Sequence, residues 1–484
     1  MKSEAVRFKL NLASESMKIL VIGLDCAAPE LLLGDQRLEN FRRLMAGGCY
    51  GRLESVIPPI TVPAWMCLAT SQDPGSLGVY GFRNRSDHSY SALGTVNSKS
   101  IQQFAIWDQM ALQGKKSIII GVPPSYPPRK IKGICVGCFL TPDPDKNLYT
   151  YPASAQIQIE KLVGTYPVDV KEFRTDQKDW LLKEIYAMSR KHFEVVRHFL
   201  QHSDWDYFQF VEIGLDRIHH GFWQFHDPLH VQFEPGNRYV QVIRDYYLHL
   251  DQELGKILDL LDEETVVLAV SDHGAQRLDG GFCVNEWLIQ EKWLVLDQYP
   301  SEITPFNKLA VNWEKTRVWS EGGYYARIFF NVKGREPQGA IERADYEVFR
   351  DEVKDRLEAT VDDKGNRMGT LVFKPEQIYR AVNNVAPDLI VHFGGLFWRS
   401  IGSVGYPTMH IQENDTGPDA CNHAQFGAFI LSAPGSGLRG EIKEAHLLDM
   451  APTLLRLGGY DVPPSMQGKL IGEGRVRSTD ESPL

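Results

Sequence analysis

The sequence predicts an α/β fold with a mostly parallel central sheet, helices on both faces and a smaller insertion or cap. Short apolar segments rich in β-branched residues recur along the chain, and long helical patterns separate them. Strands that alternate with helices in this way form a parallel sheet covered on both faces. At 484 residues the chain also exceeds the usual size of one hydrophobic core, which predicts a second unit or an insertion.

The first predicted strand is MKILVIGLD, residues 17–25, a short apolar run that ends in an acid. Similar runs follow at residues 115–123, 206–214, 265–274, 387–393 and 424–435. Continuous apolar runs of this length are typical of strands buried on both faces. Helices are predicted over residues 179–203 and 237–261, where apolar side chains recur with helical spacing.

Residues 298–370 are more polar and irregular, and they contain the loop-like segment NVKGREPQG. We expect this stretch to form an insertion or cap. The predicted organisation is a flexible leader (1–16), a first part of the core (17–297), the insertion (298–370) and a second part of the core (371–484).

Composition and charge exclude several classes of partner. The formal net charge is -10 without a block of like charges, so a nucleic acid polymer is not an expected partner, because phosphate backbones require a basic face. The N-terminal residues lack the apolar stretch of a signal peptide, and no segment approaches the length of a membrane span. The seven scattered cysteines fit a reducing compartment. We expect a cytoplasmic enzyme that does not associate with membranes, and no feature indicates an oligomeric state.

Acids and histidines stand where predicted strands end. Asp25 ends the first strand, Asp216 follows residues 206–214, and Asp272 and His273 end residues 265–274. Ligands of open parallel sheets bind beyond the carboxyl ends of the strands, so these side chains are candidate functional groups. Taken alone, Asp25 is more readily a turn residue or the N-cap of the next helix.

The segment GLDRIHHGFWQFHD, residues 214–227, carries the next candidates. If a helix begins near Asp216, then His220 lies four residues later on the same face, and both side chains can reach one cation. His219 lies three residues after Asp216 and shares that face too, so the pattern leaves the choice of histidine open. A surface acid beside a histidine in an aromatic core is the alternative.

In the segment SDHG, a turn at Gly274 can bring Asp272 and His273 into one pocket, although a structural Asp–His pair at a strand end is the alternative. His423 directly precedes the predicted strand at 424–435. The full candidate set is three aspartates and three histidines at element ends: Asp25, Asp216, His220, Asp272, His273 and His423. Such a set suits zinc or a similar divalent ion, and six ligands suit two ions.

A two-ion site for phosphoryl transfer also requires a nucleophile. Thr61 lies in PPITVPAW, where neighbouring prolines stiffen the loop. A free threonine hydroxyl is a weak nucleophile, but coordination by a metal lowers its pKa. Thr61 is therefore the candidate nucleophile.

The ordered set of Thr61 with the six acids and histidines resembles the alkaline phosphatase superfamily. Within it, the chain is similar to the branch of type I phosphodiesterases, nucleotide pyrophosphatases and predicted phosphohydrolases or phosphomutases. PPITVPAW resembles the nucleophile loop of that branch, and DRIHH resembles its D-x-x-x-H metal pair. HLLDMAPTLLRLGGYDVPPSMQGKL, residues 446–470, resembles the closing segment of the superfamily. The resemblance spans residues 18–470 and implies an alkaline phosphatase-like core.

The resemblance also implies roles. It selects His220 over His219, and it assigns one metal to Asp216, His220 and His423. It assigns a second metal, which Thr61 also touches, to Asp25, Asp272 and His273. It implies zinc, or manganese as in mutase-like members. The implied reaction is in-line attack of Thr61 on a small phosphorylated substrate, a phosphomonoester or phosphodiester, through a phospho-threonine intermediate. Ala64 stands where nucleotide pyrophosphatases usually carry asparagine.

Two other functions remain alternatives to this two-metal phosphoric ester hydrolase. A phosphomutase would return the phosphoryl group to another hydroxyl of the substrate, and exclusion of water is what separates it from a hydrolase. A non-catalytic member of the superfamily would bind a ligand without turnover. Retention of every candidate ligand together with the hydroxyl favours an enzyme.

Overall fold

The computed structural model describes residues 16–412 and 414–472, so nearly all of the predicted leader lies outside the described residues. The strands of its central sheet are β1 (Ile19–Leu24), β2 (Cys49–Glu54), β5 (Ser117–Ile120), β6 (Gly133–Val136), β7 (Thr150–Tyr151), β8 (Tyr207–Glu212), β9 (Val266–Val270), β19 (Phe426–Ser432) and β20 (Gly440–Glu441). They pair in the order β20-β2-β19-β9-β1-β8-β5-β6-β7.

The middle of this sheet is parallel. The pairs β9–β1, β1–β8, β8–β5 and β5–β6 all run in the same direction, and every residue of β1, β5, β8 and β9 is buried. The exceptions lie towards the edges, where β19 pairs antiparallel with both β9 and β2, and β7 pairs antiparallel with β6. The predicted mostly parallel central sheet is confirmed.

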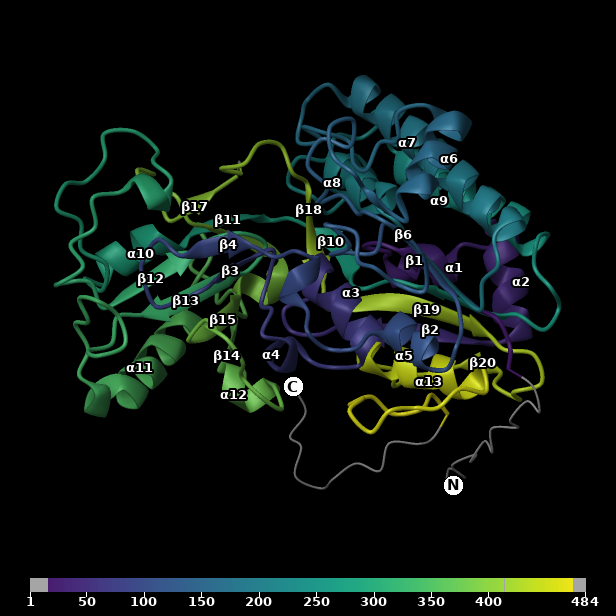
Figure 1. The fold of residues 1–484 in the computed structure, drawn as a ribbon. Coiled ribbons are helices and arrows are strands. Elements are labelled where there is room, and N and C mark those ends of the chain that lie inside the picture. The colour runs from purple at the N-terminus through teal and green to yellow at the C-terminus, as the bar shows by residue number, and fades with distance from the viewer. Residues whose placement is uncertain (1–15, 413, 473–484) are drawn as a thin grey trace, which may run out of the picture.

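Helices cover both faces of the sheet (Figure 1). One layer contains α1 (Pro29–Gly34), α2 (Glu39–Gly47), α6 (Ala153–Val163), α7 (Lys178–His202), α8 (Gly214–His226) and α9 (Val242–Leu258). The other contains α3 (Thr61–Thr70), α4 (Pro74–Leu77), α5 (Ile106–Leu112) and α13 (Met450–Leu457). Side chains alternate between the faces of a strand, so Leu20 and Ile22 of β1 pack in the first core and Ile19 and Val21 in the second.

A smaller unit with its own core lies beside the central sheet (Figure 1). Its four-stranded sheet contains β12 (Val318–Glu321), β13 (Ala326–Phe330), β15 (Leu389–His392) and β14 (Leu371–Phe373). Its three-stranded sheet contains β16 (Trp398–Ile401), β11 (Gly280–Cys283) and β17 (His410–Ile411). The helices are α10 (Val284–Gln290), α11 (Tyr346–Glu358) and α12 (Pro375–Ile378).

The apolar run at 387–393 forms a strand, but that strand is β15, which pairs antiparallel with β13 and β14 in the smaller unit instead of extending the central sheet. Burial on both faces makes its composition resemble that of a central strand. The division of the chain at residues 298 and 370 stays a prediction.

The remaining strands are short. β3 (Arg83–Arg85) and β4 (Leu93–Thr95) form a hairpin, and β10 (Gly274–Arg277) pairs antiparallel with β18 (Cys421–Ala424). The β10–β18 pair places His423 opposite Ala275, so a late segment of the chain returns to the carboxyl end of β9. In the described ranges, no helix combines the length and apolar character needed to cross a membrane.

Candidate functional site

The first group of predicted ligands combines α8 with β18. Since α8 begins at Gly214, Asp216 and His220 lie one helical turn apart, and His220 Nε2 is 3.2 Å from Asp216 Oδ1. His423 Nε2 from β18 lies 3.8 Å from the same oxygen. The ligand atoms of the three residues all lie within 4.8 Å of one another.

The second group gathers at the carboxyl ends of two adjacent parallel strands. Asp25 follows β1, and Asp272 and His273 follow β9. His273 Nε2 is 3.2 Å from Asp272 Oδ2 and 3.8 Å from Asp25 Oδ1, and the ligand atoms again lie within 4.8 Å of one another. The three side chains are fully buried.

The two groups adjoin each other. The rings of His273 and His423 stack with their centroids 3.9 Å apart, because the pairing of β10 with β18 brings the two histidines together. The structure therefore gathers the six side chains, which the sequence spreads over some 400 residues, into one cluster. Each residue of the cluster is at most 2% exposed.

Thr61 lies at this cluster. Thr61 Oγ1 is 3.2 Å from His273 Nε2, and the Thr61 side chain lies in a buried position. The sequence predicts Thr61 in a stiff loop that a helix follows, and the structure makes Thr61 the first residue of that helix, α3. The preceding residue, Ile60, has an apolar side chain that cannot cap the helix, so the first-turn amides of Thr61 and Val62 form an uncapped N-terminus. Such a terminus favours negative charge.

The three histidines of the cluster are each anchored through Nδ1, so that Nε2 faces the cluster. Each directs Nδ1 at an acceptor oxygen: His220 at Asp419 Oδ1 (2.6 Å), His423 at the Pro59 carbonyl (3.0 Å) and His273 at the Gly274 carbonyl (3.1 Å). Carbonyl and carboxylate oxygens only accept, so each Nδ1 carries a proton and donates it. In a neutral imidazole the lone pair then resides on Nε2, which faces the cluster.

Unpartnered buried atoms show that this cluster fits a cation. Within the described part of the chain, Asp25 Oδ1, Asp272 Oδ2 and His220 Nε2 are buried without a hydrogen-bond partner. Buried polar atoms nearly always have a partner. The two carboxylate oxygens are acceptors, and His220 Nε2 is an acceptor when its ring is neutral. A set of carboxylate oxygens and imidazole nitrogens is what zinc and similar divalent ions bind.

The carboxylates of the second group repel each other in the absence of a cation. Burial, together with the charge of Asp216, raises the pKa of Asp25. Burial and the charge of Asp25 likewise raise the pKa of Asp272. A divalent ion would remove this repulsion and hold both groups ionised.

His219 is separated from the cluster. Its ring packs against Trp223 and Tyr247, with centroid distances of 5.2 and 5.8 Å. Burial lowers the pKa of His219 to about 3. Both histidines follow Asp216 on α8, but only His220 has its ligand nitrogen within 4.8 Å of the other two ligand atoms.

Sequence reasoning missed the residues that support the ligands. Asp419 Oδ1 accepts a hydrogen bond from His220 Nδ1, and Trp65 Nε1 donates to Asp25 Oδ2 at 2.8 Å. The sequence spacing could have indicated Trp65, because it lies four residues after Thr61 and a helix there would place the two side chains on one face. Asp419 precedes His423 by four residues, but in an extended segment this spacing indicates no contact.

Tyr324 is a further missed residue and covers the cluster. It lies in the turn between β12 and β13 of the smaller unit. Its ring stacks on His423 at a centroid distance of 4.2 Å and on His220 at 5.1 Å. The cluster is thus enclosed by the smaller unit, a contact between segments about 100 residues apart.

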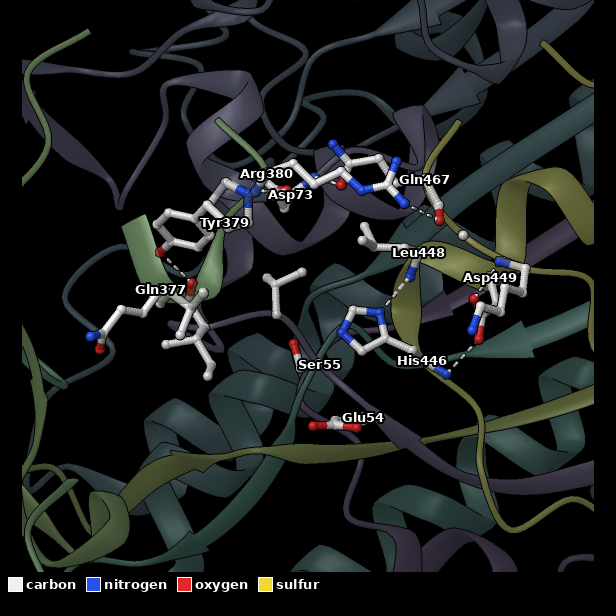
Figure 2. Close-up of a pocket in the computed structure, with 16 residues that line it drawn as sticks. Glu54, Ser55, Asp73, Gln377, Tyr379, Arg380, His446, Leu448, Asp449 and Gln467 are labelled. Carbon is white, nitrogen blue, oxygen red and sulfur yellow. Dashed lines mark hydrogen bonds between the residues drawn. The ribbon is translucent and has the colours of Figure 1, made fainter. Parts of the chain in front are cut away.

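A separate cavity of about 450 Å³ adjoins the segment 54–57 (Figure 2). Tyr379, Arg380, His446 and Gln467 line it, and Ser55 links it to the cluster by donating to the Asp272 carbonyl at 2.5 Å. Its lining residues include neither Thr61 nor any member of the two ligand groups. The cavity is therefore distinct from the ligand cluster.

Comparisons with known proteins give a family and a shared fold for the chain. The family profile described as type I phosphodiesterase / nucleotide pyrophosphatase matches residues 19–419. No curated protein sequence matches the chain.

The structure of phosphonoacetate hydrolase from Sinorhizobium meliloti 1021, in complex with phosphonoformate, superposes with a TM-score of 0.58 at 14% identity, covering 94% of this chain and 100% of that one. An inactive variant of murine ectonucleotide pyrophosphatase / phosphodiesterase 5, in complex with AMP, gives a TM-score of 0.52 at 13% identity, covering 93% and 96%. At these identities the likeness shows a shared fold.

Proposed function

This chain belongs to the type I phosphodiesterase / nucleotide pyrophosphatase family of the alkaline phosphatase superfamily, and from that premise we propose that it is a metal-dependent phosphohydrolase with Thr61 as its nucleophile. The observation that carries the proposal is the position of the Thr61 hydroxyl, 3.2 Å from His273 Nε2. It lies beside two adjoining groups of candidate ligand atoms, in which Asp25 Oδ1, Asp272 Oδ2 and His220 Nε2 have no hydrogen-bond partner among the described residues. The substrate is a phosphomonoester or phosphodiester.

Each group would hold one divalent ion. Asp216, His220 and His423 form the first site, and Asp25, Asp272 and His273 form the second. Their oxygen and nitrogen donors suit zinc, and manganese is the alternative. When bound, the two ions would polarise the phosphoryl oxygens and lower the pKa of a coordinated hydroxyl.

The protein's own groups would then position and stabilise the reaction. Thr61 Oγ1 loses its proton and forms a bond to phosphorus while the bond to the leaving group breaks, and the leaving oxygen takes the electron pair and, overall, one proton. The uncapped N-terminus of α3 favours the negative charge on the phosphoryl oxygens. Water then cleaves the phospho-threonine bond, which releases phosphate or a phosphomonoester and restores the hydroxyl.

A small phosphorylated molecule is the proposed substrate. Two solved proteins of the same fold are bound to AMP and to phosphonoformate, both of which are small anions with a phosphorus centre. The buried cluster, with ligand residues no more than 2% exposed, suits a compact phosphoryl group better than a polymer.

The test compares substitutions of two threonines on the same helix. Thr61→Ala should lower hydrolysis of 4-nitrophenyl phosphate and of its bis-aryl diester by at least roughly a thousandfold. Thr61→Ser should retain measurable activity and allow a phosphorylated residue to be trapped in acid. Thr70→Ala is the control, because Thr70 ends α3 and donates to the Met66 carbonyl at 2.7 Å. Intact hydrolysis in Thr61→Ala, or less than one equivalent of transition metal in purified wild-type protein, would refute the proposal.

Enclosure of the cluster favours a second candidate, a phosphomutase. Tyr324 stacks on two of the ligand histidines, and such a cover keeps water from a phospho-threonine. With sugar phosphates as substrates, a mutase would yield positional isomers at constant organic phosphate. Steady release of inorganic phosphate supports the hydrolase.

A further inference from the structure

His220 differs from the other two inward-facing histidines in the group that anchors it. The Nδ1 atoms of His273 and His423 donate to neutral peptide carbonyls at 3.1 and 3.0 Å. His220 Nδ1 instead donates to the carboxylate of Asp419, and this hydrogen bond is shorter, at 2.6 Å. A hydrogen bond to an ionised acceptor is roughly twice as strong as a neutral one.

The Asp419 carboxylate is itself held from the opposite side. Its Oδ2 accepts from Arg174 Nε and from Arg399 Nη1, each at 3.0 Å, and its side chain is fully buried. Both carboxylate oxygens are therefore occupied. Asp419 is in a position to orient a ligand, and it could coordinate a cation itself only by giving up one of these bonds.

The hydrogen bond at Nδ1 affects the other ring nitrogen of His220, Nε2, which faces the cluster. Nε2 lies 3.2 Å from Asp216 Oδ1 and has no hydrogen-bond partner in the described part of the chain. An anchored Nδ1–H fixes the plane of the ring and the tautomer, and an anionic acceptor increases the electron density on Nε2. This arrangement prepares Nε2 to donate to a metal.

We infer that Asp419 is a positioning residue that sets the affinity of the first metal site through His220. The inference rests on the proposed function, because it concerns the metal sites assigned there. It predicts an asymmetry: loss of the carboxylate weakens the site of Asp216, His220 and His423. The site of Asp25, Asp272 and His273 is unaffected, because a carbonyl anchors its histidine.

The experiment measures zinc affinity in the full-length protein by competition with a chromophoric chelator. Wild-type protein should give two sites. Asp419→Asn preserves the size of the side chain but removes its charge, and should lower the affinity of one site by about 10- to 100-fold while leaving the other unchanged. The matched control is Asp415→Asn, an exposed acid four residues earlier whose carboxylate accepts from Ser403 Oγ at 3.0 Å. It should leave both affinities unchanged.

A double variant tests whether Asp419 acts by orienting His220 or only by neutralising the charge of the arginines. In Asp419→Asn combined with Arg399→Met, one positive charge is removed together with the negative one. The affinity loss should persist in this double variant. Recovery of wild-type affinity would mean that Asp419 acts by neutralising a guanidinium, which overturns the inference.

The remaining outcomes are equally decisive. Two unchanged sites in Asp419→Asn, or an equal loss at both, overturn the inference and leave the proposed function standing. A wild-type protein that binds no zinc or manganese overturns both. If Asp419→Asn does not fold, a spectrum of metal-loaded wild-type protein with ¹⁵N-labelled histidine decides: a strongly downfield Nδ1 proton that Arg399→Met perturbs supports the inference, and its absence contradicts it.

Discussion

The indole N–H of Trp65 donates to Asp25 Oδ2 at 2.8 Å, while Asp25 Oδ1 lies 3.8 Å from His273 Nε2. One oxygen of this buried carboxylate is thus held by α3, and the other is left for the proposed second metal site. The same helix carries Thr61 one turn earlier, so α3 positions both the proposed nucleophile and a candidate ligand.

Trp65→Phe should therefore weaken the second metal site by about 10-fold or more, because Asp25 loses the bond that orients it. Affinity at the first site should not change. Competition with a chromophoric chelator measures both. Trp107→Phe is the matched control, since Trp107 is buried in the same core but its Nε1 has no hydrogen-bond partner among the described residues. Equal effects of the two substitutions would contradict a role for the indole N–H.

Gly23 of β1 should not tolerate a side chain. A Cβ atom there would lie 2.6 Å from Trp65 Cη2, 2.8 Å from the Phe210 carbonyl oxygen and 2.9 Å from Val211 Cγ2. Overpacking of this kind typically costs about 1–3 kcal/mol. Gly23→Ala should lower the free energy of unfolding, measured by urea titration, by about 1–3 kcal/mol or more. Gly34→Ala, where nothing lies within 4 Å of the new Cβ, should change it little. A neutral Gly23→Ala would show that Trp65 can shift.

Tyr324 should slow the exchange of metal ions with solvent, since its ring covers two of the ligand histidines. Tyr324→Ala should speed the removal of zinc by dipicolinate severalfold. Tyr324→Phe keeps the ring and should behave like wild type. The measurement is the rate of metal loss after mixing with chelator. If the phenylalanine variant loses metal as fast as the alanine variant, the hydroxyl rather than the ring controls exchange.

His192 should make stability depend on pH. Burial lowers the pKa of His192 to about 4, from 6.5. The folded state therefore binds fewer protons than the unfolded state between these values, so stability is fully present above pH 6.5 and falls as the pH drops towards 4. The loss from this residue amounts to about 2 kcal/mol between pH 7 and pH 5.

The matched variant for this prediction is His192→Gln, which cannot titrate and keeps a donor for the Pro167 carbonyl. Urea unfolding at pH 7 and pH 5 should show a smaller decrease in stability for the glutamine variant than for wild type. Parallel decreases in the two proteins would assign the pH dependence to other groups.

Much of the fold follows from local sequence pattern. Continuous apolar runs identify β1, β8 and β9. The spacing of four residues puts Asp216 and His220 on one face if a helix begins there, and α8 is that helix. Pairing partners do not follow from such patterns. The run that forms β15 has the composition of a central strand, yet its partners lie in the smaller unit, because a buried strand looks the same in either sheet.

Local sequence pattern also identifies the candidate ligands but not the residues that support them. Acids and histidines at strand ends can be recognised because the edge of a parallel sheet is a known binding position. Asp419 and Tyr324 reach the cluster only through tertiary packing, from a segment before β18 and from the β12–β13 turn. Neither carries a local signal. Thr61 was expected in a loop directly before a helix, and the structure makes it the first residue of α3.

The pairing of β18 with β10 has a consequence for synthesis. Asp419 follows His220 by 199 residues, and the whole smaller unit is translated between them. Residues 17–274 contain Asp25, Asp272 and His273, whereas the group of Asp216, His220 and His423 is complete only after β18 has been translated. If the proposed sites bind metal, the residues of the second site therefore all leave the ribosome before the first site is complete.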